Sequence, residues 1–375
     1  MFVFAPVRTV ESGALKFTPV RLLFIKLRHI GDALIMTPTL TAARRQFPDA
    51  EIWVVVRQGC EGILAGCPAI DRLLTAAPAE KWNRGLSSLC SEVRLAATLR
   101  QQPFDCAFEL GDSSRGRWLA WLSGAKKLAT DGSLRPLSRW WRRRFALLEM
   151  PVAERKQCHR ARKDFLVTSQ LLPLGDEVPP LCFARERTED WTGATVRPPF
   201  VVFHPGTRWL RKRWPVAHWT ELGRRLTALG FQIVISAGPD LDEVALAQQL
   251  ETAIGAGTIS TAGRANWRKL AGLLHRARLF VGVDTAAMHL AAACQCPTVA
   301  IFGPSKPAIW HPWRVLHRLV GPPGAILAEM RALELEEQER LGGTLTERVA
   351  LDDVWMATSQ LLQELTVAEE SCQKG

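Results

Sequence analysis

The stretch LFVGVDTAAMHLAAACQCPTVAIFG, Leu279 to Gly303, decides the fold class of this chain. An apolar run ends at Val283, small residues with the pattern of a short helix follow, and a second apolar run begins at Pro297. Two buried strands joined by a helix are typical of a parallel sheet, because parallel neighbours need a crossover connection. The stretch therefore predicts an α/β protein whose sheet is covered by helices on both faces.

The same alternation precedes this stretch in the second half of the chain. The runs FVVFHPG from Phe200 and FQIVISAG from Phe231 are typical of strands, and the helical pattern VAHWTELGRRLTALG lies between them. Together these segments predict a doubly wound domain over residues 200–348. None of its loops has the spacing GxGxxG, which argues against an NAD enzyme.

Strand and helix patterns also alternate in the first half. Three apolar runs have the length of buried strands: RLLFIK at 21–26, EIWVVV at 51–56 and FDCAFEL at 104–110. A helix is predicted from Ala33 to Gln46. Since a Pro-rich polar passage separates the halves, we expect a first domain over residues 1–180 and a linker over 181–199. A separate amphipathic segment at the end of the chain predicts a final helix within 349–375.

Composition narrows the classes of protein that fit. The 375 residues, 47% of them hydrophobic and 23% charged, can form two globular cores. No uninterrupted apolar run is long enough to span a membrane, and the first residues lack a basic start, so we expect a cytoplasmic protein. The net charge of +11 favours an anionic partner. Arginine and tryptophan gather in RPLSRWWRRRF (135–145) and RWLRKRWP (208–215).

Asp284 and Thr285 follow a predicted strand and precede a predicted helix. The free backbone N–H groups of a helix N-terminus bind anions. His289 comes four residues after Thr285, so both side chains lie on one helix face and can flank one phosphate. The alternative is a helix cap beside a core histidine.

A second candidate anion site is the loop HPGTRWLRKRWP (204–215), which also follows a predicted strand. An ammonium group such as that of Lys212, placed over a diphosphate, would neutralise a leaving group. The alternative is a solvated basic loop.

The segment KLRHIGD (26–32) ends the first predicted strand with Lys26, Arg28 and His29 and then presents Asp32. These neighbours would hold the carboxylate ionised. A carboxylate at the end of a strand that faces a nucleotide domain is placed to act as a general base. The alternative is that Asp32 only caps the following helix.

Three long blocks occur in this order: KLRHIGDALIMTPTLTAARRQFPDAEIWVVV, FHPGTRWLRKRWPVAHWTEL and ARLFVGVDTAAMHLAAACQCPTVAIFGPSKPAIWHPW. Together they resemble the family-9 glycosyltransferases, the lipopolysaccharide heptosyltransferases. KLRHIGD and GPSKPAIWHPW are most similar to the heptosyltransferase III branch. The resemblance implies a GT-B fold, with two Rossmann-like domains facing each other across a cleft and a final helix packing back on the first. It also implies inverting transfer from ADP-L-glycero-D-manno-heptose to the lipopolysaccharide inner core, without a metal or another cofactor.

The resemblance also assigns roles by position. Asp32 matches the catalytic base. The positions that match donor contacts are Thr207, Lys212, Asp242, Asp284, Thr285, Ala286 and His289. On the acceptor side we place Arg57, Arg115, Arg135 and Arg142. Of these four, Arg57 and Arg135 match family positions, Arg142 is inferred from composition, and Arg115 is placed by its position shortly after the run ELGD. The chain departs from the family pattern at His29 and Ala286, and Glu243 is the alternative to Asp242 as ribose ligand.

These inferences predict a monomeric enzyme that acts on a lipid A-core oligosaccharide, peripherally at the cytoplasmic face of the inner membrane, with no nucleic-acid partner. Two alternatives stay open from the residues alone. One is a GT-B-type sugar-nucleotide epimerase, which would need further acid and base groups facing the sugar. The other is a non-catalytic nucleic-acid-binding module that uses the Arg/Trp clusters.

Overall fold

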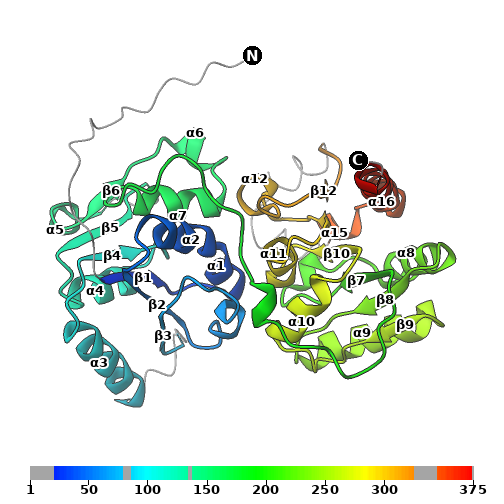
Figure 1. The fold of residues 1–375 in the computed structure, drawn as a ribbon, viewed down its shortest axis with the longest axis horizontal. Helices are drawn as coiled ribbons and strands as arrows, with labels where there is room; N and C mark the ends of the chain where they lie inside the picture. Colours follow the sequence, from blue (N-terminus) through cyan, green and yellow to red (C-terminus); the bar gives the residue numbers. More distant parts are fainter. Residues whose placement is uncertain (1–20, 79–85, 134–136, 325–343, 374–375) are drawn as a thin grey trace.

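The computed structural model describes residues 21–78, 86–133, 137–324 and 344–373, which form two α/β domains side by side (Figure 1). The first sheet contains β1 (Arg21–Lys26), β2 (Glu51–Arg57), β3 (Arg72–Ala76), β4 (Cys106–Glu109), β5 (Lys127–Asp131) and β6 (Ala146–Leu148). The second sheet contains β7 (Phe200–His204), β8 (Gln232–Ile235), β9 (Thr258–Ser260), β10 (Leu279–Val283), β11 (Thr298–Ile301) and β12 (His317–Val320).

Both sheets are parallel and share one strand order. The first runs β3-β2-β1-β4-β5-β6 and the second β12-β11-β10-β7-β8-β9. In each sheet the chain starts in the middle, adds strands outward on one side, and then returns to add strands on the other. The order therefore reverses between β1 and β4 and between β7 and β10, and doubly wound sheets bind ligands at the carboxyl ends of the strands at such points. The predicted α/β fold with two doubly wound domains is confirmed.

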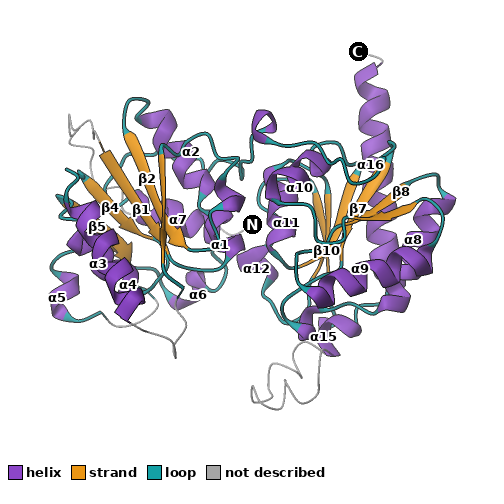
Figure 2. Ribbon diagram, turned by 90° about the horizontal axis from the view of Figure 1, so that it is seen from below, coloured by secondary structure: helices purple, strands orange, loops and turns teal. Residues whose placement is uncertain are grey.

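Helices cover both faces of each sheet (Figure 2). Those of the first domain are α1 (Ile30–Ile35), α2 (Thr37–Gln46), α3 (Leu86–Arg100), α4 (Ser114–Leu122), α5 (Arg139–Arg142), α6 (Val152–Arg155) and α7 (Arg160–Thr168). Those of the second are α8 (Val216–Ala228), α9 (Leu241–Ile254), α10 (Trp267–Leu274), α11 (Ala286–Ala293), α12 (Pro307–Trp310), α15 (Thr344–Glu347) and α16 (Leu351–Gln373). No helix of these described residues is long and apolar enough to cross a membrane.

The predicted helix from Ala33 to Gln46 is two helices in the structure. α1 begins earlier, at Ile30, and the break falls at Met36. Pro38 causes it, because a proline has no N–H to donate and its ring clashes with the carbonyl four residues earlier, so it fits only in the first turn of a new helix. The Thr37 hydroxyl bonds to the carbonyl of Leu34 at 2.8 Å and satisfies one group at the break.

One hydrophobic core continues from the first domain into the second. It joins the inner face of the first sheet and α1, α2 and α7 to α10, α11 and the inner face of the second sheet. The linker is part of this core: the Phe183 ring is buried, its N–H bonds to Ala293 O at 3.2 Å and its carbonyl accepts from His275 at 2.9 Å. The two domains are therefore packed together through this core.

The final helix packs on a different surface from the one expected. In α16, Val354, Leu361 and Leu362 are buried with Phe203, Ile301 and other residues of the outer face of the second sheet. Ion pairs fix it there, Arg278 with Glu369 and Arg318 with Glu364. The prediction that this helix packs back on the first domain is therefore wrong, because its apolar stripe completes the core of the second domain (Figure 1).

Candidate active site

The candidate residues lie on loops that leave the central strands of both sheets. Asp32 lies in the first turn of α1, after β1, and Lys212 lies in the loop after β7. Asp284 and Thr285 follow β10, and Asp112 follows β4. These four loops start at the two points where strand order reverses. The topology therefore brings together segments that are more than 250 residues apart in the chain.

α1 packs directly against α11, and this contact joins the two halves of the site (Figures 1 and 2). Gly31 makes it possible, because an added Cβ would lie 3.1 Å from Cδ2 of His289 and 3.5 Å from Cα of Ala286. The glycine thus favours close approach of the two helices. Ala286, the small residue that opens α11, is suited to the same contact.

Three buried polar atoms at this contact have no hydrogen-bond partner among the described residues: Oδ1 of Asp32, Oγ1 of Thr285 and Nδ1 of His289. Asp32 and His289 are buried, and Thr285 is half-buried. Neither Asp32 nor Thr285 makes a capping hydrogen bond with its side chain. An unpaired buried polar atom costs about 1–3 kcal/mol. Such atoms gathered at one place indicate a ligand site. The alternative role of helix cap does not account for Asp32 or Thr285, because neither side chain makes a capping hydrogen bond.

The charges around this place come from both domains. Burial lowers the pKa of His289 to about 4, although the carboxylates of Asp284 and Asp32 oppose the shift, so the imidazole is neutral at pH 7. Burial also lowers the pKa of His29; Asp32 opposes this shift, and Arg57 and Arg208 add to it. Arg57 of the first domain and Arg208 of the second therefore both act on His29, as Asp32 does.

Lys212 reaches the turn after β10. Its Nζ lies 2.6 Å from Oδ2 and 3.2 Å from the main-chain O of Asp284. Thr207, in the same loop as Lys212, is buried and accepts a hydrogen bond from the N–H of Trp209 at 3.3 Å. The structure thus brings together Lys212, Asp284, Thr285 and His289.

Asp242 lies apart from this group. It is exposed in the first turn of α9 and lines an open cavity of about 660 Å³ with Arg213 and Glu347. Its neighbour Glu243 points the other way: Oε2 accepts from the N–H of Gly238 at 2.9 Å, and a Cβ at Gly206 would lie 2.7 Å from it. The geometry therefore favours Glu243, the alternative raised above, as the acid beside the loop after β7.

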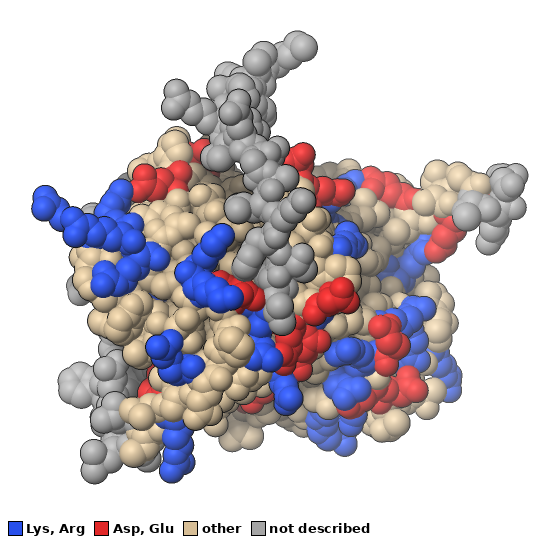
Figure 3. All heavy atoms as spheres, turned by 60° about the vertical axis from the view of Figure 1, so that its left-hand side comes forward, with Lys and Arg blue, Asp and Glu red and all other residues tan. Residues whose placement is uncertain are grey.

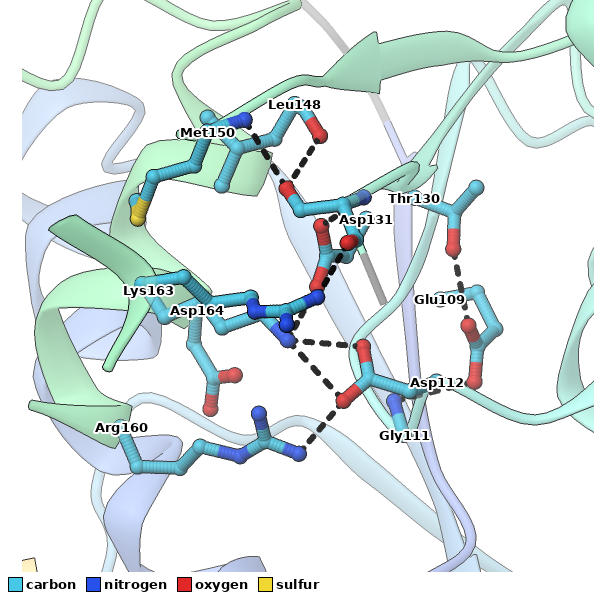
Figure 4. A network of polar contacts seen from close by, with 12 residues as sticks. Glu109, Gly111, Asp112, Thr130, Asp131, Leu148, Met150, Arg160, Lys163 and Asp164 are labelled. Carbon is cyan, nitrogen blue, oxygen red and sulfur yellow. Dashed lines mark hydrogen bonds and ion pairs between the residues drawn. The ribbon is translucent and has the colours of Figure 1, made fainter. Parts of the chain in front are cut away.

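A network of buried charges lies in the first domain (Figure 4), and the Asp32 carboxylate acts on one of its members, Arg160. Asp112 accepts from Arg160 at 2.5 Å and from Lys163 at 2.9 Å, and Lys163 also pairs with Asp131. Burial alone would raise the pKa of Asp112, but Arg160 and Lys163 hold it at about 2. Sequence reasoning did not single out these residues. The available signal was the position of Asp112 directly after a strand, together with the i, i+3 spacing of Arg160 and Lys163 on one helix face.

The predicted acceptor-side arginines do not lie together. Arg57 ends β2 and acts on His29, so it lies near Asp32. Arg115 bonds to Glu92 and, at 2.8 Å, to Ala77 O, which ties α4 to α3. Arg142 pairs with Glu149 at 2.6 Å on the far edge of the sheet. Arg135 lies outside the described residues.

α7 and α12 form a second contact between the domains. The His159 ring stacks on Trp313 with centroids 4.5 Å apart, and its Nε2 lies 3.0 Å from His311 O. The Arg160 guanidinium lies 5.8 Å from the centre of the Trp310 ring. The segment GPSKPAIWHPW therefore contacts the buried charge network at Arg160 from the side of the second domain.

The chain resembles known proteins in both sequence and structure. The model of glycosyltransferase family 9 (heptosyltransferase) matches residues 92–337. Lipopolysaccharide heptosyltransferase 1 of Pseudomonas aeruginosa is 31% identical, over 76% of this chain and 79% of that protein. Lipopolysaccharide heptosyltransferase 3 of Escherichia coli is 29% identical, over 76% of this chain and 84% of that protein.

Two solved structures share the fold. The heptosyltransferase WaaC of E. coli, solved with ADP, superimposes with a TM-score of 0.72 at 19% identity, covering 91% of this chain and 99% of that chain. A family-9 glycosyltransferase of Veillonella parvula has a TM-score of 0.72 at 22% identity and covers 92% of this chain and 97% of that one. These likenesses confirm the GT-B fold. On the extent of the family match and the identity over three quarters of its length, this chain belongs to glycosyltransferase family 9, the heptosyltransferases.

Proposed function

We propose that this protein transfers heptose, with inversion, from ADP-L-glycero-D-manno-heptose to the inner core of lipopolysaccharide. The observation that carries the proposal is the group of unpaired buried atoms of Asp32, Thr285 and His289 where α1 meets α11. One side of this place offers an anion site and the other a carboxylate. An inverting transfer needs one base for the acceptor hydroxyl and one site that binds the leaving diphosphate. The Asp32 carboxylate would be the base, and the anion site would bind the diphosphate.

In the proposed reaction Asp32 removes the proton from an acceptor hydroxyl as its oxygen attacks the anomeric carbon of heptose. The bond between that carbon and the diphosphate oxygen breaks, and ADP leaves with the electron pair. Lys212, the N-terminus of α11 and an N–H of His289 would meet the charge that grows on the diphosphate. Since Lys212 already balances Asp284, donor binding would redirect its ammonium group toward phosphate. We propose that these groups suffice without a metal ion.

We further propose that the acceptor is a lipid A-core oligosaccharide and that the enzyme works as a monomer, peripherally, at the cytoplasmic face of the inner membrane. Arg57 and Arg28 stand on Asp32's side of the site and suit the phosphates and acidic sugars of such a core. By the wording of KLRHIGD and GPSKPAIWHPW we propose the third type of heptosyltransferase. Identities of 31% and 29% to enzymes of types 1 and 3 do not separate the types.

A transfer assay tests this proposal. The purified protein is incubated with ADP-heptose and core acceptors that carry no heptose, one heptose or two, and products are weighed by mass spectrometry. The expected result for the third type is one added heptose on the acceptor that already carries two, with equimolar ADP and inverted anomeric configuration, both unchanged by EDTA. Transfer only to the heptose-free core would assign the first type, and loss of activity with EDTA would contradict the metal-free mechanism. Donor incubated alone distinguishes the epimerase, which would change the sugar without an acceptor.

A further inference from the structure

Helices α4 and α5 bring four tryptophans together on the outer side of the first domain. Trp118 and Trp121 come from α4, and Trp140 and Trp141 from α5. Their neighbouring ring centroids are 4.4–5.5 Å apart. We call the surface formed by Trp118, Trp121, Leu122, Trp140, Trp141, Arg139, Arg142, Arg143 and Arg144 the Trp–Arg face.

The apolar part of the Trp–Arg face is both exposed and anchored. Trp118 is 47% exposed, Trp121 37% and Leu122 41%. Beneath them, Trp141 packs edge-on against the buried ring of Phe145 at 5.5 Å, which belongs to the core on the outer face of the first sheet. Large apolar side chains exposed together are uncommon on a monomer and mark an interaction surface.

The basic part surrounds the tryptophans. Arg139, Arg142, Arg143 and Arg144 are exposed, and the Arg144 guanidinium lies 3.7 Å from the centre of the Trp140 ring. Glu149 pairs with Arg142, which leaves the face with a clear excess of positive charge. Figure 3, which brings this side of the molecule forward, shows basic side chains projecting at the left over largely uncharged surface. The partner must therefore be apolar enough to accept indole rings and also anionic.

The Trp–Arg face begins at the rim of a cavity in the first domain. This cavity of about 450 Å³ lies at the carboxyl ends of β1, β4 and β5 and is lined by Arg28, Asp112, Arg117 and Leu137. α4 starts at the cavity with Ser114, and α5 starts two residues after Leu137. A large surface that binds to the face would thus bring its attached groups to the edge of this cavity.

We propose that the Trp–Arg face docks the protein on an anionic phospholipid bilayer, with the indole rings at headgroup level and the arginines on lipid phosphates. Tryptophan concentrates at the interface between membrane and water, and each basic residue near an anionic surface adds about fivefold to binding. The proposal extends the membrane association proposed above by assigning it to named residues, and it rests on that association but not on the transfer chemistry.

Ring geometry favours a bilayer over a nucleic acid. Nucleic acids stack their bases on exposed aromatic faces. Here most ring pairs are crossed, at 83° for Trp140 with Trp141 and 78° for Trp118 with Trp121, so the edge of one ring lies against the face of its neighbour. Crossed rings instead expose the apolar edges of the indoles, which suit insertion among lipid headgroups.

Co-sedimentation with vesicles tests the proposal. The wild-type protein is mixed with vesicles of phosphatidylcholine alone or with phosphatidylglycerol added, at low and at physiological salt. The basic variant is Arg139→Ser, Arg143→Ser, Arg144→Ser; it omits Arg142 because that residue has an assigned acceptor role. The apolar variant is Trp118→Ser, Trp121→Ser. The matched control, Arg45→Ser, Arg162→Ser, Arg197→Ser, removes the same charge from other exposed positions.

The wild-type protein should bind anionic vesicles and not neutral ones. The basic variant should bind about 100-fold more weakly at low salt, with a smaller effect at high salt, and the control should match wild type. The apolar variant should lose the binding that persists at high salt. Unchanged binding of the basic variant, equal loss in the control, or tighter binding to a single-stranded oligonucleotide than to anionic vesicles would overturn the proposal.

Two further readouts separate this proposal from the proposed function. The basic variant should keep the wild-type ADP affinity and its transfer rate to a soluble core lacking lipid, but lose rate on acceptor embedded in anionic vesicles. If the protein transfers no heptose at all and yet its vesicle binding follows the pattern above, the proposed function fails and the docking face stands. If heptose transfer occurs and the variants bind vesicles like wild type, only the docking face fails.

Discussion

Asp32, Thr285 and His289 each leave a buried polar atom unpaired, and together they are the most informative residues of this chain. A stable fold usually pairs such atoms, because the loss of hydrogen bonds to water is otherwise uncompensated. These residues come from two domains and meet only at the α1–α11 contact. Their unpaired atoms are therefore best explained as places kept for a ligand.

The change Asp32→Asn tests the carboxylate. Transfer should fall by about 10²–10⁴-fold, because an amide cannot accept the acceptor proton. ADP affinity and the melting temperature should stay close to wild type, since Oδ1 of Asp32 makes no hydrogen bond that the change would break. Steady-state kinetics, calorimetry with ADP and thermal unfolding measure the three quantities. Asp49→Asn, an exposed acid in the same domain, is the control, and near-normal kcat in Asp32→Asn would reject the base.

The change His289→Ala tests the anion side. The imidazole is neutral at pH 7, because burial lowers its pKa to about 4, so it would contribute hydrogen bonds and not charge. We expect kcat/KM for the donor to fall on the order of 10- to 100-fold, the value of about one or two hydrogen bonds to a charged group. KM for the acceptor should not change. A loss confined to acceptor KM would move His289 to the other side of the reaction.

At the scale of elements, the function depends on the packing of α1 against α11. α1 is only six residues long, from Ile30 to Ile35, and starts directly after β1. α11 has the small residues AAMHLAAA and is buried along most of its length. Small residues let two helix backbones approach closely, and the approach here places a carboxylate of one domain beside the anion-binding end of a helix of the other.

The change Gly31→Ala tests this approach. Its Cβ would lie 3.1 Å from Cδ2 of His289, so the two helices must separate slightly. Overpacking of this kind costs about 1–3 kcal/mol. The expected result is a lower melting temperature together with lower kcat, measured by thermal unfolding and transfer assays. Gly321→Ala is the control, because its Cβ would meet only Phe302 O, at 3.7 Å. Wild-type kinetics in Gly31→Ala would show that close approach is not needed.

At the scale of the whole molecule, two kinds of contact hold the domains together. One is the shared hydrophobic core that includes Phe183 and α10 and α11. The other is polar: His159 at the start of α7 accepts from the N–H of Ala161 through Nδ1 and bonds to His311 O of the second domain through Nε2. With both ring nitrogens engaged, this histidine is bound in its neutral form.

This arrangement predicts a pH dependence of stability. Burial, together with the nearby His311 and His289, lowers the pKa of His159 to about 2, from an ordinary value of 6.5. Between these values the unfolded chain binds a proton that the folded chain does not, so stability is full above pH 6.5 and falls as pH drops below it, by about 1.4 kcal/mol per pH unit. Urea unfolding at pH 6.5 and 5.5 should show a smaller loss in His159→Gln than in wild type. Equal losses would contradict the lowered pKa.

Much of the fold could be predicted because its signals are local. Apolar runs such as RLLFIK and LFVGVD became β1 and β10, and the alternation of strands and helices became two parallel sheets. The break between α1 and α2 was missed, although Pro38 signals it, because the apolar pattern continues across it. Short strands such as β6 and β9, of three residues each, carry too little pattern to be recognised alone.

By itself the sequence determined that this is an α/β chain with two doubly wound domains and that Asp32, Lys212, Asp284 and His289 follow predicted strands. Only the tertiary structure decided that Gly31 packs on His289 and that α16 completes the second core. It also decided that Asp112 pairs with Arg160 and Lys163. The direction of Glu243, toward the loop after β7, was likewise settled only there. The reason is physical. Strand and helix formation depends on neighbours in the chain, whereas these contacts join residues far apart in the chain, and which of them meet is settled by the packing of whole domains.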